Sequence, residues 1–142
     1  MKEEVKFKRR IFNVDNNPFE LWINTSVIDD PHKNDFSWCW RVELRKFDDT
    51  ENDEANLQQL MIEIIQKIMP VCTIKMTGIT LHKDLYEIIF YAKEEDTKTI
   101  AGEFIELPNE IEDREKRFIG YHSKRDKNWD HVKLYFEAIT KK

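Results

Sequence analysis

The sequence predicts an α+β domain of the ferredoxin-like type, in which an antiparallel sheet carries two helices on one face. Three observations predict it. The tract 37–47 alternates apolar and polar residues, as a half-buried antiparallel strand does. Between residues 57 and 68, apolar residues recur at steps of three and four, as on an amphipathic helix. The strand-like tracts 71–81 and 85–92 are separated by only three residues, which predicts a hairpin.

The length of 142 residues fits a single domain, 1–142, and the 40% of apolar residues suffice for a hydrophobic core. The two cysteines, Cys39 and Cys72, are too few for a disulfide framework. No apolar run approaches the ~18 residues of a membrane span, and the charged start of the chain does not resemble a signal peptide. We therefore expect a cytoplasmic protein without membrane contact, with residues 1–10 as a flexible lead-in.

The first element that we expect is a strand over 19–28, followed by a turn-rich loop at 29–36 that contains Pro31. The strand 37–47 comes next and has one apolar face and one mixed face. Its apolar face holds Trp38, Trp40, Val42 and Leu44, and its other face holds Cys39, Arg41, Glu43 and Arg45.

The acidic tract 48–54 leads into the first helix, which Asp49 or Thr50 could cap and which Pro70 ends. After the hairpin, we expect a second helix at 94–107 and an acidic loop at 108–115. A last strand at 116–124 and a C-terminal helix at 128–140 complete the chain.

The expected order is β-β-α-β-β-α-β-α, which reduces to the ferredoxin-like β-α-β-β-α-β unit without its first strand and last helix. In that unit the strand 37–47 is central, so both of its neighbours are taken. The strand 19–28 therefore either extends an edge of the sheet or covers its open face. If the strand 71–81 is an exposed edge, it could pair two subunits, and the sequence leaves the oligomeric state open.

Several short motifs between Leu57 and Ile139 resemble the regulator of ribonuclease E activity B proteins, and resemble more closely a related bacterial family of unknown function. They are the Leu- and Ile-rich helix, Met-Thr-Gly-Ile-Thr at 76–80, Tyr-Glu-Ile-Ile-Phe-Tyr at 86–91, and Lys-Arg-Asp-Lys-Asn-Trp at 124–129. Asp126 and Trp129 stand at the family's Asp-x-x-Trp positions, whereas the tract 29–54 is longer and more acidic than the family pattern. The resemblance implies a ferredoxin-like domain without known catalytic residues. For the ribonuclease regulators, it implies inhibition of the nuclease by protein contact.

Catalytic and metal-binding motifs are missing from the sequence. The four histidines (His32, His82, His122 and His131) follow no H-x-x-x-H spacing, and the cysteines form no C-x-x-C pair. No G-x-S-x-G or glycine-rich phosphate loop occurs. The paired carboxylates lie in predicted loops or helix starts that water reaches, whereas catalytic acids usually need burial to shift their pKa. We therefore expect no enzymatic activity, no metal and no cofactor.

The charge distribution is uneven although the net charge is only −5. The tracts 29–54 and 94–115 carry nine acidic residues each, and the tract 116–142 carries eight basic ones. Acidic loops can dock on a basic protein surface and speed the encounter. The candidate partner-binding residues are Asp29, Asp30, Asp48, Asp49, Glu51, Asp53, Glu94, Glu95 and Asp96. The basic tract contains aromatic residues but no RNP-type or GXXG motif, so nucleic-acid binding ranks below protein binding.

The sequence thus predicts a non-catalytic domain that binds a protein, most readily a basic one, as a regulator or inhibitor of an RNA-processing enzyme. An immunity-type inhibitor of a toxin is an alternative of the same class. The other alternative is a small-molecule-binding domain, with a concave site between the sheet and the segment 19–36 that Trp22 and Tyr86 would line.

Overall fold

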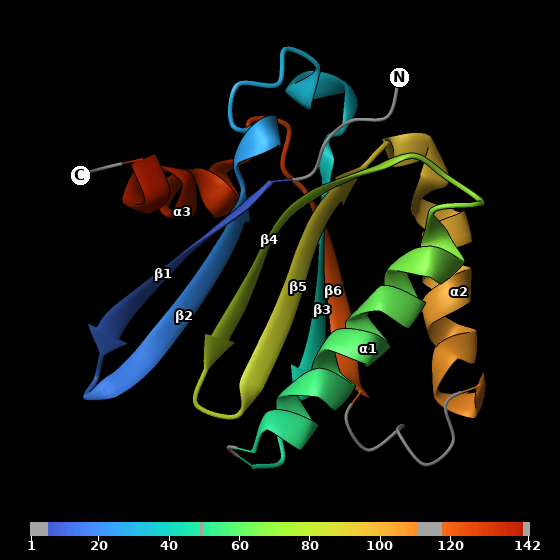
Figure 1. Cartoon of the computed structure of the whole chain (residues 1–142). Coiled ribbons are helices and arrows are strands. Elements are labelled where there is room, and N and C mark those ends of the chain that lie inside the picture. The colour runs from blue at the N-terminus through green and yellow to red at the C-terminus, as the bar shows by residue number, and fades with distance from the viewer. Residues whose placement is uncertain (1–5, 49, 111–117, 141–142) are drawn as a thin grey trace.

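The computed structural model describes residues 6–48, 50–110 and 118–140, which form one six-stranded antiparallel sheet and three α-helices (Figure 1). The strands are β1 (Phe7–Val14), β2 (Asn17–Asn24), β3 (Trp38–Arg45), β4 (Ile74–His82), β5 (Leu85–Ala92) and β6 (Phe118–Arg125). The helices are α1 (Glu51–Ile68), α2 (Thr97–Glu110) and α3 (Asp130–Thr140). The expected α+β class is confirmed.

The strands lie side by side in the order β1-β2-β4-β5-β3-β6. Strand β3 lies between β5 and β6, as expected for the tract 37–47. Strand β2 pairs with β4, so the tract 19–28 extends an edge of the sheet instead of covering its open face. Strand β4 is consequently an interior strand of the sheet, so the condition under which it could pair two subunits is not met.

Strand β1 differs from the prediction, in which residues 1–10 are a flexible lead-in. Asp15 and Asn16 both adopt the left-handed conformation, with φ of 52° and 64°. This conformation allows a two-residue hairpin turn whose twist matches that of the strands. The turn sets β1 against the whole length of β2, from Val14–Asn17 to Phe7–Asn24. Strand β2 itself ends at Asn24 and is followed by a 3-10 turn over Thr25–Val27.

The helix boundaries follow local capping. Thr50 caps α1, since its side-chain oxygen accepts a hydrogen bond from the backbone N–H of Asp53 at 3.1 Å. The other candidate cap, Asp49, lies outside the described residues. Helix α2 continues past the expected end at residue 107 to Glu110, so part of the expected loop 108–115 is helical. The rest of that loop lies outside the described residues.

The sheet separates two hydrophobic cores, because α1 and α2 cover one face and α3 with the segment 25–36 covers the other (Figure 1). The alternation in β3 is confirmed: Trp40 lies in the first core and Cys39 in the second. The first core contains Trp40, Val42, Leu44, Leu57, Leu60, Ile64, Ile68, Ile79, Leu81, Tyr86, Ile88, Phe90, Ala92, Ile100 and Phe104. The second contains Leu21, Ile23, Val27, Phe36, Cys39, Ile89, Tyr91, Trp129, Val132, Phe136 and Ile139.

Candidate functional site

The Asp-x-x-Trp positions lie in the turn from β6 into α3, and both side chains are buried. The Asp126 carboxylate accepts the backbone N–H groups of Asp130 at 2.8 Å and His131 at 3.0 Å, so it caps the N-terminus of α3. It also accepts the Tyr91 hydroxyl at 2.6 Å. Burial acts to raise the pKa of Asp126, but these three hydrogen bonds outweigh burial and hold the pKa below its ordinary value. Asp126 therefore has a structural role in this geometry.

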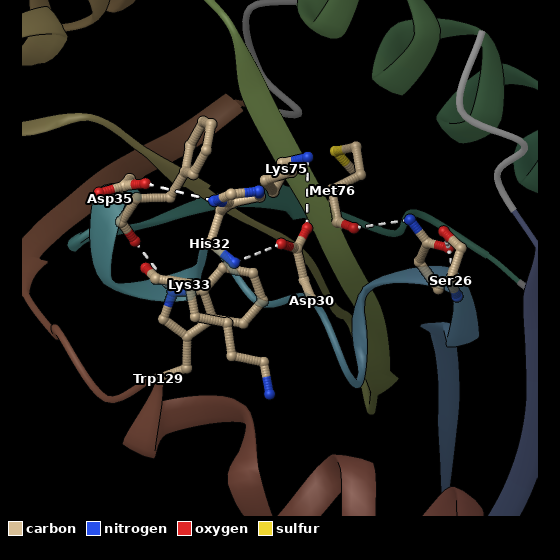
Figure 2. Close-up of polar contacts among 10 residues, drawn as sticks. Ser26, Asp30, His32, Lys33, Asp35, Lys75, Met76 and Trp129 are labelled. Atoms are coloured by element: carbon tan, nitrogen blue, oxygen red, sulfur yellow. Dashed lines mark hydrogen bonds and ion pairs between the residues drawn. The ribbon is translucent and has the colours of Figure 1, made fainter. Parts of the chain in front are cut away.

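Trp129 fastens the loop 29–36 to the sheet. Its ring stacks on Tyr91 with centroids 4.3 Å apart, and its indole N–H donates to the carbonyls of Phe36 at 2.9 Å and Lys33 at 3.1 Å. Figure 2 shows Trp129 beside Lys33 in this loop. Both Asp-x-x-Trp side chains thus hold α3 and the loop in place.

The acidic positions of this loop are partly used inside the fold (Figure 2). The Asp30 carboxylate lies 3.3 Å from Lys75 Nζ and accepts the backbone N–H of His32 at 2.8 Å. Only 8% of its side chain is exposed. Burial acts to raise the pKa of Asp30, and the hydrogen bonds from His32 and Lys75 lower it overall. Asp29, by contrast, is exposed.

The acidic residues at the entry to α1 accept backbone hydrogen bonds within the fold. Asp53 is buried, and its carboxylate accepts the backbone N–H groups of Phe47 at 2.9 Å and Asp48 at 3.3 Å. Asp48 in turn accepts the backbone N–H of Thr50 at 2.9 Å. The next acidic residue, Glu51, is exposed.

The third acidic group follows β5. Glu94 forms an ion pair with Arg125 at the end of β6, and Glu95 is exposed. Asp96 is half-buried, and Asp49 lies outside the described residues.

The described acidic positions do not gather on one surface. Asp29 and Asp30 lie near the sheet end where Trp38 pairs with Ala92, and Glu94 to Asp96 follow at the same end. Asp48, Glu51 and Asp53 follow the other end of β3, and the seven steps from Trp38 to Arg45, at about 3.3 Å each, put that end roughly 23 Å away. A partner would therefore meet two separate acidic regions.

On the sheet face that carries α3, two side-chain contacts link three neighbouring strands. His122 of β6 pairs with Glu43 of β3, and Arg41 of β3 lies 3.4 Å from Glu87 of β5. Burial raises the pKa of Glu87, and the nearby Arg41 guanidinium only partly offsets this increase. The alternation in 37–47 predicts Arg41 and Glu43 on one face, as found, whereas Glu87 was not among the predicted site residues. Its position two residues before the buried Ile89 was the available signal.

The described residues leave an apolar groove on the opposite face, between α1 and the β1–β2 hairpin. It consists of two hollows, of about 210 and 190 Å³, which share Phe7, Met61 and Ile62. Phe7 and Ile62 are each 43% exposed. The other lining residues are Trp22, Gln58, Ile65, Gln66, Met76, Ile79 and Tyr86. We call this feature the α1–hairpin groove.

The groove continues into a polar hollow of about 450 Å³ at the hairpin turns. The pairing Glu20–Leu81 is next to Trp22–Ile79 on the same sheet face, so the two regions adjoin. The polar hollow is lined by Asn17, Pro18, Glu20, Lys46, Leu81, Lys83 and Asp84.

The expected small-molecule site is placed differently from the prediction. Trp22 and Tyr86 do line one hollow together. Its other wall is α1, however, because the segment 25–36 packs on the opposite face of the sheet. The expectation of a site between the sheet and 19–36 is therefore wrong.

The cysteines show no sign of an activated thiolate. Burial raises the pKa of Cys39 and of Cys72 to about 11, so both are thiols at neutral pH. Within residues 6–48, 50–110 and 118–140, no group of three or more His, Cys, Asp or Glu side chains is arranged to hold a metal ion.

None of the helices in the described part of the chain has the length and apolar character needed to cross a membrane. Comparison of the chain with protein-family models, curated proteins and solved structures finds no match.

Proposed function

We propose that this chain is a non-catalytic protein-binding domain that receives an amphipathic helix of its partner in the α1–hairpin groove. The observation that carries the proposal is the groove itself, an open apolar channel with a helix as one wall and a sheet as its floor. Helix-in-groove binding uses this combination.

The width of the uncovered floor supports a helix as occupant. Strands lie about 4.8 Å apart, so β1 and β2 extend the sheet by roughly 10 Å beyond β4. Packed helices are separated by about 8–10 Å. The hairpin thus adds room for one more helix beside α1.

The composition of the groove also suits a protein interface. Interface cores are rich in aromatic residues and methionine and poor in charge. Phe7, Trp22 and Tyr86 supply aromatic surface, and Met61 and Met76 supply flexible thioether side chains that adapt to a partner.

A small molecule is the second candidate, favoured by the polar hollow. Its volume of about 450 Å³ falls within the range of small-molecule sites, roughly 300–1,000 Å³. An amphiphile could place a charged group near Lys46 and Lys83 and its apolar part along Trp22.

We also propose a ferredoxin-like topology for the central part of the fold and a target class for the binding. The segment β3-α1-β4-β5-α2-β6, with spatial order β4-β5-β3-β6, supports a ferredoxin-like unit to which β1, β2 and α3 are added. The resemblance to the ribonuclease regulators favours an RNA-processing enzyme as target, and an immunity-type inhibitor is the alternative. The exposed Asp29, Glu51 and Glu95 leave acidic positions for a basic partner.

Photo-cross-linking in cells tests the groove. A photoreactive residue would replace Ile62 on the groove lip and, in a control, Leu134 on α3, which is 73% exposed on the other side of the sheet. We expect a discrete protein adduct from position 62 and none from position 134. Equal adducts from both positions, or none from position 62, would refute the proposal.

A further inference from the structure

We propose that α3 and the loop 29–36 form one acid-sensitive unit, which opens from the sheet when His131 takes up a proton. The inference concerns the sheet face that carries α3, so it does not depend on the α1–hairpin groove of the opposite face. Three observations carry it: the contacts that α3 and the loop share, the enclosure of the His131 ring, and the charges around that ring.

Helix α3 and the loop 29–36 are held to the sheet by shared contacts. The Trp129 ring stacks on a tyrosine of β5, and its indole N–H donates to the carbonyls of Phe36 and Lys33. Lys33 Nζ lies 5.5 Å from the ring centroid of Trp129 and 5.4 Å from that of Phe136. Because the same side chains hold both segments, we expect the two to open together as a local cooperative unit. We call them the α3–loop unit.

The side chain of His131, in the first turn of α3, is enclosed by protein. Its Nε2 atom is buried and has no hydrogen-bond partner among the described residues. Its ring stands perpendicular to that of Tyr135, with centroids 6.2 Å apart. A neutral imidazole can leave Nε2 as a bare acceptor, whereas protonation would put a charged N–H donor there without an acceptor. An unpaired charged donor costs more to bury than an unpaired neutral acceptor, so the closed unit favours the neutral ring.

The charges around the ring also oppose its protonation. Arg41 of β3 and Lys124 of β6 act on His131 as like charges, and the Asp126 carboxylate acts in the opposite direction. The positive end of the α3 dipole lies at the same turn. Burial first, and then the two cations, hold the pKa of His131 below its ordinary value of 6.5.

The other titratable groups of this face are partnered or neutral. Glu87 of β5 lies 3.4 Å from Arg41, and burial raises the pKa of Tyr135 so that its hydroxyl is neutral at physiological pH. Protonation of His122 of β6 strengthens its pair with Glu43 and therefore opposes opening. The His122 side chain is 54% exposed, however, so water and salt screen this contribution.

The sign of the pH dependence follows from the closed and open states. In the open unit, water surrounds His131 and its pKa returns to its ordinary value of 6.5, whereas the pKa in the closed unit is lower. The open unit therefore binds more protons, and closure loses stability as the pH falls from 6.5 towards the pKa of the closed unit. Between about pH 7.5 and about pH 5.5, the equilibrium constant for opening should rise by up to about 10-fold through this one group.

Native-state hydrogen exchange, read by mass spectrometry on peptides of α3 and α1, tests the inference. After correction for intrinsic exchange rates, α3 of the wild type should lose up to about 10-fold of its protection over this pH range. In His131→Gln, whose side chain stays neutral, the protection of α3 should change by less than about 2-fold. His131→Phe is a second neutral variant that keeps a ring against Tyr135, and circular dichroism checks that both are folded. His122→Gln is the matched control and should keep the wild-type response.

Each result supports or overturns the inference. Faster exchange of α3 than of α1 at the lower pH supports a separate unit, and equal protection of the two helices would overturn it. A wild-type response that persists in both neutral variants would overturn His131 as the proton acceptor. Nuclear magnetic resonance should show the His131 ring titrating below pH 6.5, and a midpoint at or above that value would overturn the enclosure argument. None of these outcomes bears on the photo-cross-link at position 62, so the proposed function is tested separately.

Discussion

Replacing the buried Asp126 with alanine should lower the free energy of unfolding strongly. The substitution removes the N-cap of α3, which is worth about 1 kcal/mol. It also leaves the Tyr91 hydroxyl buried without its acceptor, at a cost of about 1–3 kcal/mol. We expect a loss of about 2–4 kcal/mol in the free energy of unfolding. At about 3 °C per kcal/mol for a chain of this size, the melting temperature should fall by about 6–12 °C.

A double-mutant cycle with Tyr91→Phe isolates the buried hydrogen bond. Alone, Tyr91→Phe should cost about 1.5 kcal/mol, since it removes a bond to a charged acceptor. In the Asp126→Ala background it should be neutral or stabilising, because it removes a hydroxyl that has lost its partner. The coupling energy between the two positions should therefore be about 1.5–3 kcal/mol.

Urea unfolding followed by tryptophan fluorescence measures all four proteins, because Trp129 stacks directly on Tyr91. Asp130→Ala is the control. This substitution removes an exposed carboxylate four residues after Asp126, in the first turn of α3. Only its interaction with the helix dipole is lost, so the free energy of unfolding should fall by less than about 1 kcal/mol. Additivity of Asp126→Ala and Tyr91→Phe within about 0.5 kcal/mol would refute the reasoning.

The pH dependence of the same variant has a defined sign. The pKa of Asp126 is lowered from its ordinary value of 3.8 by folding, so its contribution is fully present above pH 3.8. It is lost as the pH falls through the pKa of the folded state. The stability difference between wild type and Asp126→Ala should therefore shrink below pH 3.8, and a difference that grows there would contradict the assignment.

Three further predictions concern the sheet and the thiols. Gly78→Ala should cost about 1–3 kcal/mol, because a Cβ there would lie 2.8 Å from Cδ1 of the fully buried Ile23 and 3.0 Å from the backbone carbonyl oxygen of Trp22. At Gly120 an added Cβ meets nothing within 4 Å, so Gly120→Ala should be tolerated, and equal midpoints of the two variants in urea would contradict this. Burial raises the pKa of Glu87 above its ordinary value of 4.5. The wild type should therefore lose stability relative to Glu87→Gln as the pH rises from 4.5 through the pKa of the folded state. Stability curves of the two proteins that stay parallel over this pH range would count against a buried carboxylate. Iodoacetamide at pH 8 should modify Cys72 before the fully buried Cys39, and both should react faster in urea; rapid native labelling of Cys39 would disprove its burial.

The expected patterns in α1 and β3 were confirmed because they are local. A step of three or four residues places Leu57, Leu60 and Ile64 on one side of any helix, and alternation places Trp40 and Cys39 on opposite faces of any strand. The expected hairpin of β4 and β5 has the same origin, since three residues between two strand-like tracts leave little choice of topology. Trp22 and Tyr86 line one hollow as predicted, but α1 forms its opposite wall instead of the predicted segment 19–36.

The remaining features depend on which segments meet, and the sequence by itself does not state that. Strand β1 carries three consecutive cations, Lys8 to Arg10, instead of a regular alternation, and it forms by pairing along the whole length of β2. The buried Glu87 forms its ion pair with Arg41, which lies on another strand. The Asp126 carboxylate accepts the Tyr91 hydroxyl only because the turn into α3 packs against β5. The groove requires α1 to lie next to a hairpin about 40 residues earlier in the chain. Periodicity determined the elements of this protein, whereas non-local pairing of strands determined its site, because burial and charge at a position are set by neighbours that are distant in sequence.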